Sequence, residues 1–348
     1  MKKSIAFIVM LTFIFVVLTA IIINIKHPKS KNNGEKIEVV ATLFPQYDFA
    51  KQVGGDKVNV TLLLPPGTES HTYEPTPQDM VMVDQSNLFI YTGAEMEPWA
   101  ENLISGMKND INVLDLSKSV ELINVEEFEE EHENDEEQHH LEGGEDDNEH
   151  EEHNHEGEHS HEDEHHHTYD PHIWLNPQYA VKMVRSIEQE LSKVDPDNAE
   201  YYKTNADNYI SQIIELDTEF EETVKNAKNS NNSKNPKIAF GGAFAYAYFV
   251  ERYNLDFISA YETCGESAEP STVKVKEVID YIKSNRIPVI FYKEYTNGNI
   301  AKTISDATGA KMLVFNTVHN VSKEEINSGA SYVSIMRSNL ENLKQALK

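Results

Sequence analysis

Short apolar segments alternate with amphipathic ones along most of this chain. The β-branched and aromatic runs at 37–44, 58–64 and 87–93 each predict a buried strand, and helical sequence separates them. Beyond a polar break at 229–236, a second series of four such runs follows, at 237–244, 255–261, 287–294 and 311–317. Strands that are almost wholly apolar and alternate with helices predict parallel sheets with helices on both faces. The pattern therefore predicts an α/β fold with two βα-type lobes.

Two long amphipathic segments lie between these series. Residues 177–194 predict one helix, and a second, beginning with Asp195 as N-cap before Pro196, runs to about residue 228. Apolar positions in the second recur every three or four residues, at Tyr202, Ala206, Tyr209, Ile213, Leu216 and Phe220. The expected organisation is an N-terminal lobe at 37–177, a connecting helical segment at 178–229 and a C-terminal lobe at 230–348.

The first 25 residues predict a targeting segment. Two lysines precede an apolar run from Ile5 to Ile25, which is long for a signal-peptide core and approaches the length of a membrane-spanning helix. No cysteine lies directly after this run, so attachment of lipid to a processed N-terminal cysteine is not expected. We expect an uncleaved membrane anchor at 1–25, with a cleaved signal as the alternative, and a polar tether at 26–36. Either arrangement places the folded part outside the cytoplasm.

Residues 126–168 form a low-complexity insert of Glu, Asp, His, Asn and Gly, with almost nothing apolar after Phe128 and Leu141. Positions 126–164 hold 21 of the 59 carboxylates and no Lys or Arg, so the rest of the chain carries only about −8 of the net charge of −29. A segment this polar buries too little to offset its ordering entropy, so we expect it to be disordered. Nucleic acid is excluded as a partner because phosphate binding needs clustered Lys and Arg.

The fifteen histidines point to metal chemistry. Eleven lie in the insert, and we expect them to collect metal weakly at many sites near the fold. Eight of them form the auxiliary low-affinity metal loop that we expect within the insert: His150, His153, His155, His159, His161, His165, His166 and His167. One histidine, His27, lies in the tether, and only His71, His172 and His319 remain in the folded body. Three neutral imidazoles with a water or one oxygen donor complete a tetrahedral zinc site.

The residue types narrow the choice of metal. The single cysteine, Cys264, excludes an internal disulfide and a site built from several thiolates. Ca²⁺ and Mg²⁺ prefer oxygen ligands and do not suit a histidine set. The set favours Zn²⁺, while Ni²⁺ and Cu²⁺ also accept imidazole.

Several motifs resemble those of the zinc/manganese branch of ABC-transporter solute-binding proteins. They are "LLLPPGTESHTYEPTPQD", "DPHIWLNP", "AEPS" and the C-terminal "SGASYVSIMRSNLENLKQAL", and the resemblance spans residues 37–348. It implies two α/β lobes joined by a backbone helix, with the metal held in the cleft between them. It also implies that His71 and His172 are ligands, that His319 takes the place of the last ligand, and that a His-rich insert marks a zinc-selective member.

One position departs from the family pattern. The resemblance places a third ligand, His or Glu, at residue 241, where this chain has glycine in "FGGAFAYAYF". Either His319 compensates, giving three imidazoles and a water, or another residue of the C-terminal lobe supplies a donor. Glu294 is the favoured extra donor, ahead of three residues in "YETCGES": Glu262, Cys264 and Glu266.

The predicted function is a non-enzymatic, monomeric receptor that captures Zn²⁺ and delivers it to a membrane ABC permease. A manganese receptor or adhesin of the same family is the first alternative, with Mn²⁺ or Ni²⁺ as the other metals. A zinc hydrolase is the second, because three histidines with an open position also describe catalytic zinc. Against the hydrolase, none of His71, His172 and His319 stands in an H-E-x-x-H motif, which occurs only within the His-rich insert, and Asp170 is the one carboxylate beside a candidate ligand.

Overall fold

The computed structural model describes residues 36–68, 70, 73–109, 111–140, 168–231, 235–261 and 270–348. The expected anchor, nearly all of the tether and most of the insert lie outside these residues. Within the described ranges, no helix is both long and apolar enough to cross a membrane.

The N-terminal lobe is built on a four-stranded parallel sheet with the spatial order β2-β1-β3-β4. Its strands are β1 (Ile37–Ala41), β2 (Val58–Leu62), β3 (Leu88–Tyr91) and β4 (Asn112–Asp115). Its helices are α2 (Phe44–Gly54), α3 (Pro77–Asp84) and α4 (Ala100–Ser105). The apolar pattern predicted the first three strands and missed β4, because this edge strand is only partly buried.

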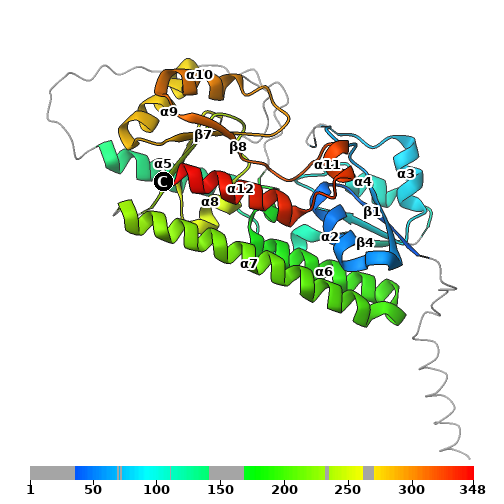
Figure 1. Ribbon diagram of the computed structural model, residues 1–348. Helices are drawn as coiled ribbons and strands as arrows, with labels where there is room; N and C mark the ends of the chain where they lie inside the picture. Colours follow the sequence, from blue (N-terminus) through cyan, green and yellow to red (C-terminus); the bar gives the residue numbers. More distant parts are fainter. Residues whose placement is uncertain are drawn as a thin grey trace, which may run out of the picture.

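The C-terminal lobe repeats this arrangement with the order β6-β5-β7-β8. The strands are β5 (Lys237–Phe240), β6 (Asp256–Ser259), β7 (Val289–Tyr292) and β8 (Lys311–Val314). The helices are α8 (Ala247–Tyr253), α9 (Thr272–Asn285) and α10 (Asn299–Thr308). After β8 the chain continues into α11 (Lys323–Asn327), which lies against the N-terminal lobe (Figure 1), and α12 (Tyr332–Ala346). The predicted pair of parallel sheets is confirmed.

Both sheets reverse their strand order at the same place, between β1 and β3 in one lobe and between β5 and β7 in the other. In doubly wound sheets, ligands bind beyond the carboxyl ends of the strands at such a switch point. Thr42 follows β1, Gly241 follows β5, and Glu294 lies two residues beyond the end of β7. The topology therefore makes these three segments candidates for the site before any side-chain contact is considered.

Helix α7 (Ala199–Asn231) runs beneath both lobes, and α6 (Pro177–Val194) lies beside it beneath the N-terminal lobe (Figure 1). Asn176 caps α6 by accepting a hydrogen bond from the backbone N–H of Gln178, and Pro177 takes the first helical position. The 33 residues of α7 correspond to a length of about 50 Å. The six residues whose spacing predicted this helix are all buried, so α7 is the spine against which both lobes pack.

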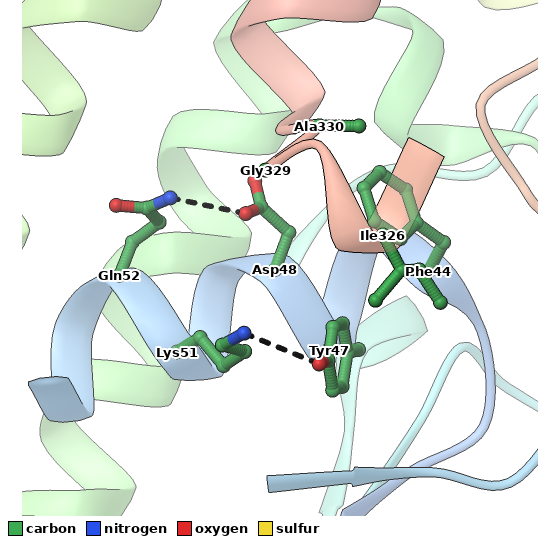
Figure 2. A pocket seen from close by; sticks show the side chains of 8 residues that line it. All are labelled: Phe44, Tyr47, Asp48, Lys51, Gln52, Ile326, Gly329 and Ala330. Atoms are coloured by element: carbon green, nitrogen blue, oxygen red, sulfur yellow. Dashed lines mark hydrogen bonds between the residues drawn. The ribbon is translucent and has the colours of Figure 1, made fainter. Parts of the chain in front are cut away.

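The C-terminal segment returns to the N-terminal lobe through a buried carboxylate. Asp48 of α2 accepts hydrogen bonds from Tyr209 of α7 (2.5 Å), from the backbone N–H of Tyr332 (2.9 Å) and from Gln52 (3.1 Å). Figure 2 shows Asp48 beside a cavity of about 160 Å³ between α2 and the turn that joins α11 to α12. Burial raises the pKa of Asp48, while its three hydrogen-bond donors oppose that shift.

The insert differs from expectation at its beginning. Helix α5 (Val125–His140) occupies a part that was predicted to be disordered. The ring of Phe128 stacks on Phe244 and Phe257 of the C-terminal lobe, with centroids 6.3 and 5.9 Å apart, and His132 lies edge-on to Phe257 at 5.1 Å. This aromatic contact supplies the burial that the acidic composition of the insert did not suggest. The remainder, from residue 141 to 167, lies outside the described residues.

Glu97 is a buried carboxylate near the carboxyl ends of β1 and β3. It accepts hydrogen bonds from the hydroxyl of Thr42 (2.5 Å), the hydroxyl of Thr92 (3.2 Å) and the backbone N–H groups of Thr92 and Gly93 (both 3.1 Å). Burial raises its pKa to about 7, although these donors act in the opposite direction. The folded protein therefore favours the neutral acid more than the unfolded chain does.

This shift predicts a pH-dependent stability. Because the folded pKa exceeds the ordinary value of 4.5, the stabilising contribution of Glu97 is complete below that value. It is lost as the pH rises to about 7, amounting to about 3 kcal/mol. Glu97→Gln, which is neutral throughout, should flatten the stability profile in this interval, as measured by urea denaturation at several pH values. The same pH dependence in the variant and the unsubstituted protein would contradict the assignment.

Candidate metal centre

His172 is held by the motif that surrounds it. Asp170 Oδ1 accepts a hydrogen bond from the backbone N–H of His172 at 2.7 Å and lies 3.0 Å from its Nδ1. The short helix η3 (Ile173–Leu175) follows at once, and the Trp174 ring meets the imidazole edge to face at 5.5 Å. His172 itself has no solvent exposure. An imidazole whose Nδ1–H is given to a carboxylate presents Nε2 without a proton, which is the form that binds a metal.

His319 is held by a second acid through a hydroxyl. The Thr317 hydroxyl donates to Glu294 Oε1 (2.5 Å), and the Thr317 backbone N–H donates to Glu294 Oε2 (2.9 Å). The same hydroxyl lies 2.5 Å from His319 Nδ1. Because its one proton goes to Glu294, Nδ1–H of His319 is the donor in that contact. His319 is therefore also assigned the tautomer with an unprotonated Nε2.

The two imidazoles lie close together. Their ring centroids are 6.3 Å apart. Zn–N bonds of about 2.1 Å place each ligating ring centre roughly 3 Å from the ion, so this separation lies at the outer limit of what one ion spans. The rings come from distant parts of the chain, and the hydrogen bond from Trp174 Nε1 to the carbonyl of Thr317 (2.7 Å) ties their two segments together.

The turn that carries His319 is strained. Val318 has a φ of 64°, in the left-handed region that a β-branched residue rarely adopts, and its side chain is fully buried. Asn316 Oδ1 accepts a hydrogen bond from the Val318 backbone N–H at 2.6 Å. Together with the bonds of Thr317 to Glu294, this contact holds a conformation that costs about 1–3 kcal/mol on its own. Such a cost is typical of a position where geometry matters for function.

The sequence-predicted residues are only partly brought together. His172 and His319 meet, whereas His71 lies outside the described residues, as do Glu262, Cys264, Glu266 and the eight histidines of the auxiliary loop. Glu294 is buried beside the pair, but both of its oxygens accept hydrogen bonds from Thr317. Burial raises its pKa. Within the described ranges, no group of three or more His, Cys, Asp or Glu is arranged to hold a metal.

Gly241 is closely covered by the backbone of α10. A Cβ placed on Gly241 would lie 2.7 Å from Ala301 Cα and 2.8 Å from its Cβ. The Gly241 backbone N–H also donates to the carbonyl of Phe291 at 2.7 Å. A ligand side chain at 241 would therefore require α10 to move, so the departure at this position is built into the packing of the lobe.

Sequence reasoning did not identify Thr317, although a signal was present. In "DPH" and in "TVH" a hydrogen-bonding side chain stands two residues before the histidine. The structure gives Asp170 and Thr317 the same task, which is to hold Nδ1 of the histidine that follows. The spacing alone is too common to be specific without the contact.

Comparison with known proteins finds relatives over most of this chain. Residues 39–346 match the family described as zinc-uptake complex component A, periplasmic (ZnuA). The high-affinity zinc uptake system protein ZnuA of Bacillus subtilis is 33% identical over 317 residues, which cover 91% of this chain and 89% of that protein. The zinc-binding lipoprotein AdcA of Streptococcus pneumoniae is 30% identical over 317 residues, covering 90% of this chain and 56% of AdcA.

Two solved structures match about nine-tenths of this chain. The Zn(II)-bound ZnuA-like domain of Streptococcus pneumoniae AdcA matches with a TM-score of 0.67 at 28% identity, covering 90% of this chain and 99% of that one. The metal-dependent lipoprotein YcdH of Bacillus subtilis matches with a TM-score of 0.68 at 30% identity, covering 89% of this chain and 99% of that one.

The close cover over Gly241 generates a prediction. Gly241→Ala should destabilise the protein by about 1–3 kcal/mol, because the new methyl group meets backbone atoms that cannot rotate away. Gly106→Ala is the matched control, since a Cβ there would meet its nearest atom at an ordinary 3.5 Å. Chemical denaturation of both variants measures the difference. Equal stabilities would show that α10 adapts and that residue 241 is not sterically closed.

Proposed function

Because this chain belongs to the family of zinc-uptake complex component A, we propose that it is the extracytoplasmic receptor of an ABC transporter. It captures Zn²⁺ between its lobes and delivers the ion to a membrane permease for uptake. The observation that carries this proposal is the pair of His172 and His319, each with Nδ1 held by a hydrogen-bond acceptor.

The proposed ligands are His71, His172 and His319, with a water in the fourth position. For Glu294 we propose an indirect role. It orients Thr317, which in turn orients His319, and it places a carboxylate near the bound cation without giving up its own hydrogen bonds. Asp170 has the corresponding role for His172.

The residues of the site contribute binding and orientation. Both imidazoles are buried, so the ion exchanges its water for fixed nitrogen donors in a region that excludes solvent. Nδ1 stays protonated in each ring, so zinc binding at Nε2 does not require a new tautomer. Relatives named for zinc uptake or zinc binding support Zn²⁺ as the cargo. A histidine set also disfavours Mn²⁺, which prefers oxygen.

We infer that the protein is not an enzyme. A zinc hydrolase needs a general base that is available to activate the metal-bound water. Asp170 is engaged by two nitrogens of His172, and Glu294 by two groups of Thr317. Both carboxylates therefore serve to position ligands.

For the segments outside the described residues we retain the sequence-based proposals. Residues 1–25 anchor the protein to the membrane, and the chain acts as a monomer. The insert collects zinc at several weak sites. Its first turns are fixed to the C-terminal lobe by Phe128 and His132, which keeps the collected metal near the protein.

The ligand assignment is tested in a chain from which most of the insert has been deleted. In a chain lacking residues 133–167, His71→Ala, His172→Ala and His319→Ala should each weaken zinc binding by at least about tenfold, measured by calorimetry with a competing chelator. His132→Ala is the matched control, because this histidine lies on α5 and contacts Phe128 and Phe257. Unchanged zinc affinity in all three variants would refute the proposed ligand set. Loss of tight zinc binding on deletion of residues 133–167 alone would refute it as well.

The role of Asp170 is tested by comparing two substitutions. Asp170→Ala removes the carboxylate that accepts from the backbone N–H and Nδ1 of His172, and it should weaken zinc binding about tenfold to a hundredfold. Asp170→Asn keeps an oxygen in the same place and should recover much of that loss. Asp195→Asn is the control. Asp195 is buried and accepts hydrogen bonds from Tyr202 and Asn198, so this substitution should leave the zinc affinity unchanged. If Asp170→Ala bound zinc as tightly as the unsubstituted protein, Asp170 would have no positioning role.

A further inference from the structure

Asn320 directly follows His319 and joins two loops that are far apart in the sequence. Its Oδ1 accepts hydrogen bonds from the backbone N–H groups of Gly67 (3.3 Å) and Val321 (2.7 Å). Its Nδ2 donates to the carbonyl oxygens of Thr68 and Pro65, the latter at 3.5 Å. Three of these four contacts go to the loop that follows β2, about 250 residues earlier in the chain.

The side chain of Asn320 is fully engaged in this contact. An amide offers two donor hydrogens and an acceptor oxygen with two lone pairs, and all four are used here. The residue is only 1% exposed. A buried amide is costly unless every group is satisfied, and an apolar side chain could have filled the same space. The arrangement is therefore specific to an amide and to the backbone geometry that it meets.

Side-chain packing does not anchor the loop 65–68, which contacts Asn320. Gly67 has a φ of 79°, and a Cβ placed there would meet no atom within 4 Å, so side-chain packing does not hold this point of the loop. The bond from the Thr68 N–H to the Pro65 carbonyl (3.1 Å) closes the turn upon itself. The bonds from Asn320 instead fix the turn to a separate segment, and the candidate ligand His71 follows Thr68 by three residues.

The segment that carries Asn320 is itself fixed to the N-terminal side of the structure. The carbonyl of His319 accepts a hydrogen bond from the Phe44 N–H of α2 at 3.2 Å. The carbonyl of Thr317 accepts one from Trp174. The turn therefore connects α2, the loop of His172 and the loop that leads to His71, although its sequence follows the last strand of the other lobe.

We propose that Asn320 is a positioning residue for zinc binding. It locks the loop 65–68 onto the turn that carries His319, so that the backbone leading toward His71 is fixed relative to this turn before the ion arrives. This proposal rests on the zinc-receptor function and on His71 as a ligand. Without the lock, the loop must be ordered at the moment of binding, which lowers affinity and speeds release.

The test is a double-mutant cycle between Asn320→Ala and His71→Ala in the chain that lacks residues 133–167. In the unsubstituted background, Asn320→Ala should weaken zinc binding about tenfold to a hundredfold and increase the rate of zinc transfer to a chelator. In the His71→Ala background it should change neither quantity, because the ligand that the locked loop supplies is already absent. Asn320→Asp keeps the acceptor toward Gly67 and loses the donors, so it should give a loss as well.

Asn339→Ala is the matched control. Asn339 is equally buried and makes two hydrogen bonds to the backbone of Asn316, on the other side of the same turn. Its effect on affinity should be the same with and without His71, whereas the effect of Asn320→Ala should disappear. Circular dichroism confirms that each variant is folded.

The outcomes separate the two proposals. If Asn320→Ala weakens binding equally in both backgrounds, or leaves it unchanged while His71→Ala weakens it, the locking role is wrong and the receptor function stands. If His71→Ala leaves the affinity of the unsubstituted chain unchanged, the ligand set is wrong and the locking role fails with it.

Discussion

The turn at residues 316–320 is the point on which the rest of the candidate site depends. Its backbone accepts hydrogen bonds from Trp174 and Phe44, its Thr317 is bound by Glu294, and Asn320 reaches the loop after β2. Val318, in the middle, holds a left-handed conformation that is unfavourable by itself. Several interactions from different elements are needed to maintain it, and those same interactions bring His172 and His319 together.

The glycine at 241 has a physical explanation in the packing of the C-terminal lobe. Helix α10 lies so close to Gly241 that a side chain has no space there. The turn of His319 is bound to α2 through Phe44, and the segment of His172 is bound to that turn through Trp174. The C-terminal lobe contributes Glu294, which acts through Thr317.

The insert is connected to the site at its base. Asn124 and Tyr169, which flank the insert, form an antiparallel β-bridge. Tyr248 of α8 accepts a hydrogen bond from the Ile123 N–H at 3.0 Å and donates to the carbonyl of Asp170 at 2.9 Å. Asp170 in turn holds His172. The His-rich insert therefore ends beside the residue that hydrogen-bonds to one of the proposed ligands.

The sequence by itself determined the two parallel sheets and the long helix, and it singled out His172 and His319. Apolar periodicity and residue type are local properties, and the buried strands and the spine α7 follow from them. Only the tertiary structure decided that Thr317 and Asp170 hold Nδ1, that α10 closes position 241, and that α5 packs on Phe257. Each of these depends on contacts between residues far apart in the chain or on a backbone conformation, such as that of Val318, which no local pattern specifies. For His71, the sequence remains the source of the assignment.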